Sequence, residues 1–230
     1  MQIITTHQSV DFDALASVVA ATLIYPEAVA VIPKAVNPNV KAFLSIHKDM
    51  FEMYRVNDID LSEVTRLIVV DTNKWSRLDR MDALKKKPDL EVWMWDHHDP
   101  VDCDLDPDWK CQKTIGANIT LMLEAIRDAG IEISPIQATL FLSGLYEDTG
   151  NLIFSSATAE DAYTAGYLLE HNADLSILRT FLQPAYGEKQ KDILFEMLKN
   201  AARRTINNYS VSINTAHING HINNLSLVVH

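Results

Sequence analysis

The feature that most constrains this chain is a short apolar run that ends in three potential metal ligands. Residues 92–95 are Val-Trp-Met-Trp, and Asp96, His97 and His98 follow directly. An apolar run of this length predicts a buried strand. Pro100 then prevents the strand from continuing, because proline cannot donate to a sheet ladder. Carboxylate and imidazole groups are therefore expected at the carboxyl end of a strand, which is where open α/β sheets bind their ligands.

Strand and helix patterns alternate through the amino-terminal half of the 230-residue chain. Apolar runs predict strands at residues 2–6, 28–32, 66–70 and 90–95. Segments with helical composition connect them, at residues 14–25, 37–48 and 76–87. Repeated strand–helix–strand order predicts a parallel sheet with right-handed crossovers. We therefore expect an α/β fold in which helices flank a parallel sheet.

The sequence pattern in the middle of the chain predicts helices and no strands. The start at Ser134 is well marked, because a capping serine is followed by proline and, three residues after the cap, by Gln137. Further helices are expected at residues 116–129, from Thr158 towards His171, after Asp174, and at residues 187–202. Together with the sheet, these helices form an expected first domain, residues 1–202.

The carboxy-terminal segment has a strand-like pattern, unlike the helical middle of the chain. Residues 208–216 alternate polar and apolar side chains like a strand, and residues 222–230 indicate the start of a further element. We therefore expect residues 203–230 to be the incomplete start of a carboxy-terminal β/α domain that binds substrate. The apolar ending indicates a piece of a longer protein.

Composition excludes some classes of function. The net charge of −11 argues against tight, nonspecific binding to duplex DNA, but bound cations can invert the local field and allow phosphate chemistry. The apolar runs are too short to cross a bilayer, so no membrane partner is expected. Cys103 and Cys111 provide no disulfide framework and fit a reducing compartment. A cytoplasmic protein is therefore expected.

Carboxylate and histidine side chains form four clusters at expected strand or helix ends. The clusters are His7, Asp11 and Asp13; Asp71; Asp96, His97 and His98; and Asp148. Such mixtures of oxygen and nitrogen donors suit divalent cations. Two cations about 3.5–4 Å apart share ligands, and Asp71 is the natural bridge because it follows a central strand. Each cluster alone has a structural alternative. The alternatives are helix caps at the first cluster, a turn at Asp71, a solvated turn with two surface histidines at residues 96–98, and a helix exit at Asp148.

The order of these motifs resembles the DHH phosphoesterase superfamily. The motifs are T-H-x-x-x-D-x-D-A from residue 6, V-V-D-T from residue 69, D-H-H from residue 96 and D-T-G from residue 148. The superfamily includes manganese pyrophosphatases, single-strand exonucleases, short-oligonucleotide nucleases and cyclic dinucleotide phosphodiesterases. Residues 3–7 and 11–17 resemble a subgroup in which this module precedes CBS domains and a poly(A) polymerase or tRNA nucleotidyltransferase module.

The resemblance implies two metal sites that share one carboxylate. The ligands implied for the first site are His7, Asp11 and Asp71. The ligands implied for the second site are Asp13, Asp71, His97 and Asp148. His98 would contact the substrate phosphate, and Asp96 would support the histidines, so these two are the implied catalytic residues. The implied cofactors are two divalent cations, Mn²⁺ first, with Mg²⁺ or Co²⁺ as alternatives.

The implied function is hydrolysis of a phosphodiester or phosphoanhydride by a water that two metals activate. A short oligonucleotide or a cyclic dinucleotide is the expected substrate. A nucleotide-binding or RNA-positioning module of a larger nucleotidyltransferase-like protein is the first alternative, and an inorganic pyrophosphatase-like hydrolase is the second. The implied partners are CBS and nucleotidyltransferase domains in a longer chain and a second copy in a homodimer. The glycine-rich stretch with histidine that holds substrate in the phosphodiesterases does not occur in this sequence.

Overall fold

The computed structural model describes residues 1–101, 103–182, 188–218 and 220. The chain divides into two compact units, Met1–Leu182 and Gln183–His230. Among the described residues, no helix is both long enough and apolar enough to cross a membrane.

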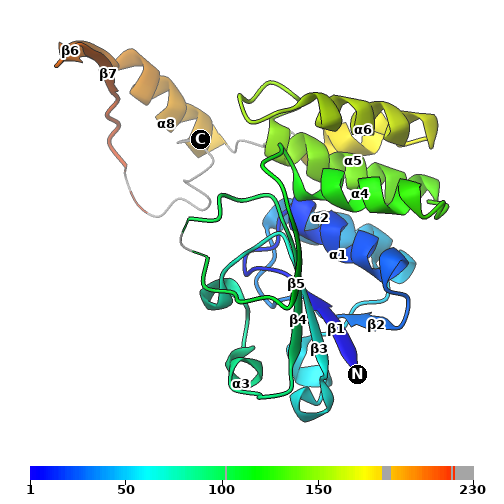
Figure 1. The fold of residues 1–230 in the computed structure, drawn as a ribbon. Coiled ribbons are helices and arrows are strands. Elements are labelled where there is room, and N and C mark those ends of the chain that lie inside the picture. The colour runs from blue at the N-terminus through cyan, green and yellow to red at the C-terminus, as the bar shows by residue number, and fades with distance from the viewer. Residues whose placement is uncertain (102, 183–187, 219, 221–230) are drawn as a thin grey trace. The chain divides into compact units, whose positions relative to one another are not determined.

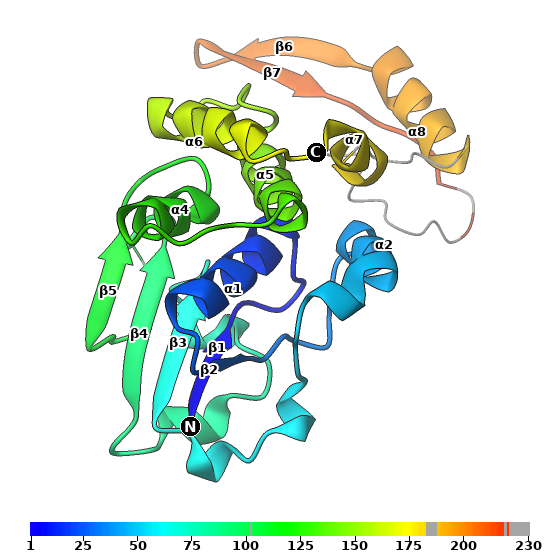
Figure 2. The ribbon, with the colours of Figure 1, turned by 90° about the vertical axis from the view of Figure 1, so that its right-hand side faces the viewer.

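A five-stranded sheet forms the centre of the first unit. Its strands are β1 (Gln2–Thr5), β2 (Ala28–Ala30), β3 (Arg66–Val70), β4 (Glu91–Asp96) and β5 (Trp109–Gln112). They lie in the order β2-β1-β3-β4-β5, and every pair is parallel (Figure 2). The predicted α/β fold with a parallel sheet is confirmed. The fifth strand was not predicted, because Trp-Lys-Cys-Gln is a short edge segment without an apolar pattern.

Helices cover one face of this sheet. They are α1 (Phe12–Ile24), α2 (Pro38–His47), α4 (Asn118–Asp128), α5 (Pro135–Thr149), α6 (Ala159–Glu170) and α7 (Leu175–Leu182). Figure 1 shows α1, α4 and α5 on one side of the strands and α3 (Asp82–Lys85) on the other. The main core, which includes Phe12, Ile68 and Phe141, fills the helical side. A smaller core, which includes Leu67 and Met94, fills the other side.

The predicted helix at residues 76–87 is wrong in extent. The structure has a 3₁₀ turn at Trp75–Arg77 and then only the four residues of α3. Leu78 pairs with His7 in a β-bridge, and Arg80 has a φ of 56°. A residue in the left-handed region cannot continue a right-handed helix, so the connection is broken there.

Helices α1 and α5 pack at close range through a glycine. A side-chain Cβ at Gly144 would lie 2.9 Å from both Asp13 Cα and Phe12 O, and 3.0 Å from Ala16 Cβ. Only glycine therefore allows the two helices to approach this closely. The approach brings the end of α5, which carries Asp148, towards the start of α1.

The described part of the second unit contains one helix and one hairpin. Helix α8 (Glu188–Lys199) is followed by the antiparallel strands β6 (Ala202–Ile206) and β7 (Tyr209–Ile213). The strand predicted at residues 208–216 is confirmed, whereas β6 was not predicted. Asn207 and Asn208 have φ values of 50° and 65°, as the two central residues of a tight hairpin turn require.

The compact units divide after Leu182, whereas the predicted domains divide after residue 202. The difference arises because α8 is connected to the segment that follows the hairpin. Asn200 Nδ2 donates to Thr215 O at 3.1 Å, and the backbone N–H of His217 donates to Glu196 Oε1 at 3.0 Å. The segment predicted at residues 222–230 lies outside the described residues.

Candidate metal centre

Strand ends and helix ends bring the predicted ligands together. His7 follows β1, Asp71 follows β3, and His97 follows β4, so all three lie at the carboxyl edge of the parallel sheet. Asp11 and Asp13 stand at the start of α1, and Asp148 is near the end of α5. Two helix ends and three strand ends thus converge on one edge of the sheet.

His7 lies between two carboxylates. Its Nε2 is 3.2 Å from Asp71 Oδ2 and 3.6 Å from Asp11 Oδ2. Asp11 is also the N-cap of α1, because its Oδ1 accepts a hydrogen bond from Ala14 N at 2.9 Å. The capping alternative considered for Asp11 is therefore confirmed. It leaves the second carboxylate oxygen facing His7, so capping and ligation can coexist.

His97 lies between Asp71 and the end of α5. Its Nε2 is 3.3 Å from Asp71 Oδ1 and 3.3 Å from Asp148 Oδ2. Its Nδ1 is 3.0 Å from Ile115 O. A backbone carbonyl accepts only from a protonated nitrogen, so this contact assigns the proton to Nδ1 and leaves Nε2 for the carboxylates or a metal.

Asp13 connects the centre to a helix that starts far away in the sequence. Its two carboxylate oxygens accept hydrogen bonds from Asn118 N at 2.6 Å and Ile119 N at 3.0 Å, the first two residues of α4. It thereby supplies the cap that α4 otherwise lacks, and the positive end of the helix dipole favours its charge. This role fixes the carboxylate within the centre.

Among the described residues, three groups of side chains each place one possible ligand atom per residue within 4.8 Å of one another. The first group is His7, Asp11 and Asp71. The second group is Asp13, Asp71, His97 and Asp148. The third group is Asp71, His97 and His98. Asp71 belongs to all three groups, which is the position that a bridging ligand would occupy.

Asp71 has an unusual backbone. Its φ is 57°, and its N–H donates to Trp95 O at 2.9 Å. A left-handed conformation is uncommon for residues other than glycine and costs free energy. The conformation turns the chain at the end of β3 and directs the carboxylate towards the two histidines, so strain at this residue serves the geometry of the centre.

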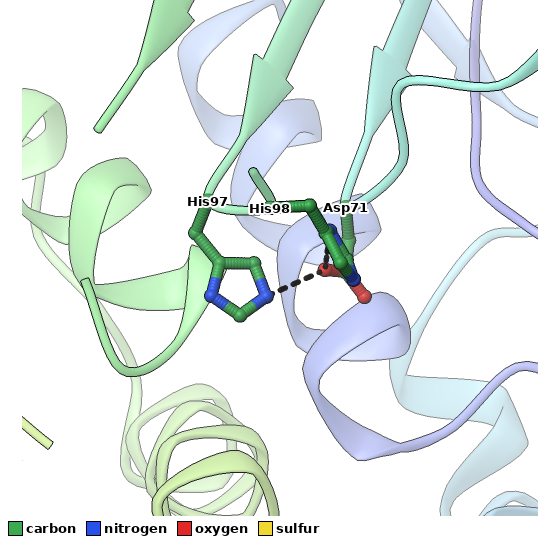
Figure 3. A group of neighbouring side chains, drawn as sticks. All are labelled: Asp71, His97 and His98. Carbon is green, nitrogen blue, oxygen red and sulfur yellow. Dashed lines mark ion pairs between the residues drawn. The ribbon is translucent and has the colours of Figure 1, made fainter. Parts of the chain in front are cut away.

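His98 and Asp96 form a hydrogen-bonded pair beside this centre. His98 Nδ1 is 2.7 Å from Asp96 Oδ1, and 3.9 Å from Asp71 Oδ1. Asp96 is fully buried and also accepts from Gln112 Nε2 at 3.2 Å. The His98 side chain is 41% exposed. Figure 3 shows His97 and His98 after one strand, with both rings directed towards Asp71 on the neighbouring strand.

Sequence reasoning missed two supporting residues. Gln112 holds Asp96, but it lies on the unpredicted edge strand. Glu147 is half-buried and accepts from Phe12 N at 2.5 Å and from Asn39 Nδ2 at 2.9 Å. It thereby ties α5 to the start of α1 and to α2. The only signal for Glu147 in the sequence is its position next to Asp148.

Electrostatics in the centre are dominated by crowded carboxylates. Burial, together with the charge of Asp71, raises the pKa of Asp11 to about 7. Burial and the charges of Asp148 and Asp71 raise the pKa of Asp13 well above its usual range. Although burial acts in the opposite direction, Asp148 and Asp71 raise the pKa of His97. Asp11 and Asp13 therefore hold protons that a cation would replace. In contrast, although burial acts in the opposite direction, His7 and His97 lower the pKa of Asp71 and keep its carboxylate ionised.

The donor set fits a metal ion. Asp71 Oδ1 and His97 Nε2 are both buried and make no well-aligned hydrogen bond among the described residues, although the two atoms lie 3.3 Å apart. Buried polar atoms normally have partners, and exceptions need an explanation. A divalent cation held between carboxylate oxygens and imidazole nitrogens would satisfy both atoms and would neutralise the repulsion between the carboxylates.

Comparison with known proteins identifies the family. The sequence model of the DHH family, N-terminal domain, matches residues 2–145, which is more than half of the chain. An A-adding tRNA nucleotidyltransferase from Geobacter sulfurreducens is 32% identical over 231 residues, covering 100% of this chain and 26% of that protein. The chain therefore spans about a quarter of the length of this relative.

A second relative is shorter. The bifunctional oligoribonuclease and PAP phosphatase NrnA of Mycoplasma genitalium is 29% identical over 116 residues, covering 50% of this chain and 36% of that protein.

Solved structures share the fold. An exopolyphosphatase-related protein from Bacteroides fragilis has a TM-score of 0.68 at 21% identity, covering 87% of this chain and 61% of that chain. A putative family II inorganic pyrophosphatase from Methanococcus jannaschii has a TM-score of 0.65 at 20% identity, covering 92% of this chain and 70% of that chain. At these identities the likeness concerns the fold alone. The family match and the arrangement of the D-H-H segment lead to one conclusion: this chain belongs to the DHH family.

Proposed function

We propose that the first unit is a metal-dependent phosphoesterase that hydrolyses a phosphodiester of a short oligonucleotide or dinucleotide. The observation that carries this proposal is the convergence of His7, Asp11, Asp13, Asp71, His97 and Asp148 in overlapping groups that share Asp71. A binding module would not need a shared carboxylate between two such groups, whereas two-metal hydrolysis does.

Some of these side chains would hold the metal ions, and others would contact the substrate. Asp71 belongs to both the first and the second ligand group and would help to hold both divalent cations, Mn²⁺ first, whereas His97 and Asp13 would hold only the cation of the second group. The cations, when bound, would activate a water and stabilise charge on the phosphoryl oxygens. His98 is held through Nδ1 by Asp96, which leaves Nε2 to contact the substrate phosphate or to assist the leaving group.

The substrate class is inferred from chemistry and from one relative. The mixture of carboxylate and imidazole ligands suits cations that bind phosphate oxygens. The relative from Mycoplasma genitalium is named as an oligoribonuclease and PAP phosphatase, which supports a short nucleotide substrate. Pyrophosphate is the second candidate substrate, and it would use the same centre.

A non-catalytic role is the competing proposal. The relative that aligns with 100% of this chain is named as an A-adding tRNA nucleotidyltransferase. In such a protein this unit would bind nucleotide or position RNA for another domain. The CBS domains and the homodimer that the resemblance implies also remain proposals.

A substrate panel distinguishes these proposals. The chain would be incubated with Mn²⁺, Mg²⁺ or Co²⁺ and with pyrophosphate, a linear dinucleotide, a cyclic dinucleotide or bis(p-nitrophenyl) phosphate. We expect Mn²⁺-dependent hydrolysis of the linear dinucleotide, and its loss in Asp71→Asn, with circular dichroism to verify folding. Metal binding without hydrolysis of any substrate would overturn the enzymatic proposal and favour the binding module.

A further inference from the structure

A pocket with three basic side chains lies at the same edge of the sheet as the candidate metal centre. Its volume is about 310 Å³, which is within the usual range for sites that bind small molecules. The residues that line it are Ile32, Lys34, Arg55, Val56, Asn57, Asp79 and Arg80. None of these residues belongs to the motifs that define the metal centre.

The position of the pocket follows from the pairing of strands. Val31 pairs in parallel with Tyr54, just beyond β2, so the pocket residues that follow these two emerge at the carboxyl edge. Leu78 pairs with His7, and Asp79 follows directly. Three segments that are distant in the sequence therefore meet beside the end of β1.

Backbone hydrogen bonds connect the pocket to the loop that carries the first ligands. Gln8 N donates to Arg77 O at 2.8 Å, and Ser9 N donates to Ala35 O at 3.1 Å. The loop between His7 and Asp11 is thus bound on one side to the segment of Asp79 and on the other to the segment of Lys34. The pocket is a direct neighbour of the metal-ligand loop.

The lining of the pocket is positively charged, although the chain as a whole has a net charge of −11. Three cations and one carboxylate leave two positive charges in excess. Asp79 Oδ2 already accepts from the backbone N–H of Lys34 at 3.0 Å. Arg80 donates to Asn57 Oδ1 at 3.0 Å, and Arg55 donates to Pro33 O. These bonds hold both guanidinium groups at the wall, and each guanidinium has five N–H donors, so others remain for a ligand.

We infer that this pocket binds a second phosphate group of the substrate, one that is not hydrolysed. The inference rests on the proposed function. The possible metal ligands are aspartates and histidines, which would hold the reacting phosphate through cations. The pocket instead offers lysine and arginine side chains to a second phosphate. Arginine and lysine are the side chains that bind phosphate most strongly. The favoured substrate therefore carries at least two phosphates, as a terminal monoester or as an internal diester.

Three oligonucleotides distinguish whether the pocket binds a terminal phosphate or an internal one. ApA has one phosphate, ApApA has a second internal phosphate, and pApA has a second terminal one. The variant Lys34→Gln/Arg80→Gln removes two positive charges from the pocket. The control Lys86→Gln/Lys110→Gln removes two from exposed positions, one just before β4 and one within the edge strand β5. Thermal unfolding of each variant verifies folding.

The measurement is kcat/KM with Mn²⁺ for each oligonucleotide. We expect the ratio of pApA or ApApA to ApA to fall by about tenfold or more in the pocket variant, because hydrogen bonds to a charged phosphate are lost. The control variant should keep the ratio of the natural chain. A fall for pApA alone assigns the pocket to a terminal phosphate, and a fall for ApApA assigns it to an internal one. An unchanged ratio for both would overturn the inference.

Failure of the proposed function would give a different result. If the natural chain hydrolyses none of the three oligonucleotides, the proposed oligonucleotide substrate is wrong, and pApA becomes a stable ligand for calorimetry. Weaker binding of pApA to the pocket variant than to the control would then still support a phosphate pocket. Equal binding to both variants would refute it.

Discussion

Gly144→Ala tests whether the close approach of α1 and α5 builds the metal centre. The new Cβ would lie 2.9 Å from Asp13 Cα and from Phe12 O. Both neighbours are backbone atoms of the α1 region, so neither can rotate away as a flexible side chain would. The two helices must therefore separate, or one of them must shift along the other.

The expected change in the free energy of unfolding follows from two opposing effects. Overpacking of a well-packed interface costs about 1–3 kcal/mol, whereas alanine in place of glycine in a helix gains about 1 kcal/mol. Gly144→Ala should therefore lower the free energy of unfolding by roughly 0–2 kcal/mol. Gly166 in α6 is a matched control, because a Cβ added there would meet no neighbouring atom within 4 Å. Gly166→Ala should keep the helical gain without the clash.

Separation of α1 from α5 should also weaken metal binding. Asp148 lies one helical turn after Gly144, and its Oδ2 contacts His97 at 3.3 Å. A shift of α5 would move Asp148 away from Asp13 and Asp71. We expect the affinity for Mn²⁺ to fall by about 10–100-fold, as for other changes in the support of metal ligands.

Urea unfolding and Mn²⁺ calorimetry on both variants measure these effects. The unfolding free energies of Gly144→Ala and Gly166→Ala should differ by about 1–3 kcal/mol, since the helical term cancels between them. Equal stability of the two variants, with equal Mn²⁺ affinity, would refute the argument that this glycine sets the geometry of the centre.

Other predictions address individual ligands and protons. Asp71→Asn should weaken Mn²⁺ binding in calorimetry more than Asp148→Asn, because Asp71 belongs to every ligand group; equal losses would contradict a bridging role. His97→Ala should lower Mn²⁺ affinity, whereas His98→Ala should keep the metal and lower kcat by roughly 10²–10⁴; equal loss of metal would reverse this assignment. Burial raises the pKa of Asp11 to about 7, so this carboxyl is protonated below that pH. Mn²⁺ binding should therefore release protons and strengthen as the pH rises through about 7. Titrations in buffers of different ionisation enthalpy would detect the release, and identical heats would argue against it.

The elements that carry the ligands could be predicted because their signals are local. The apolar run before Asp96 and the run before Asp71 both read as buried strands, and both are strands in the structure. The start of α5 at Ser134 was equally clear, since its serine, proline and glutamine lie within four residues. Parallel strands then place their carboxyl ends at one edge, so the convergence of His7, Asp71 and His97 could be expected.

Supporting contacts between residues far apart in the sequence could not be predicted in the same way. Asp13 caps α4 across 105 residues of sequence, and no local pattern marks such a pair. Gln112 supports Asp96 from an edge strand that is too short and too polar to show periodicity. Gly144 is an isolated glycine within a helical pattern, and its purpose is visible only where α1 meets α5. The basic pocket combines single residues from three segments, so it forms no motif.

Charge relates the metal centre to the basic pocket. The ligand groups contain four carboxylates, Asp11, Asp13, Asp71 and Asp148, and two divalent cations would neutralise them. The cations would replace the protons that Asp11 and Asp13 hold and would supply positive charge for an anionic substrate. Ions screen exposed charges over about 8 Å at physiological ionic strength, so the net charge of −11 matters less to a bound substrate than its neighbours do. The two excess positive charges of the pocket then give a field that favours a substrate with more than one phosphate. An acidic protein can in this way select polyanionic substrates through local charge.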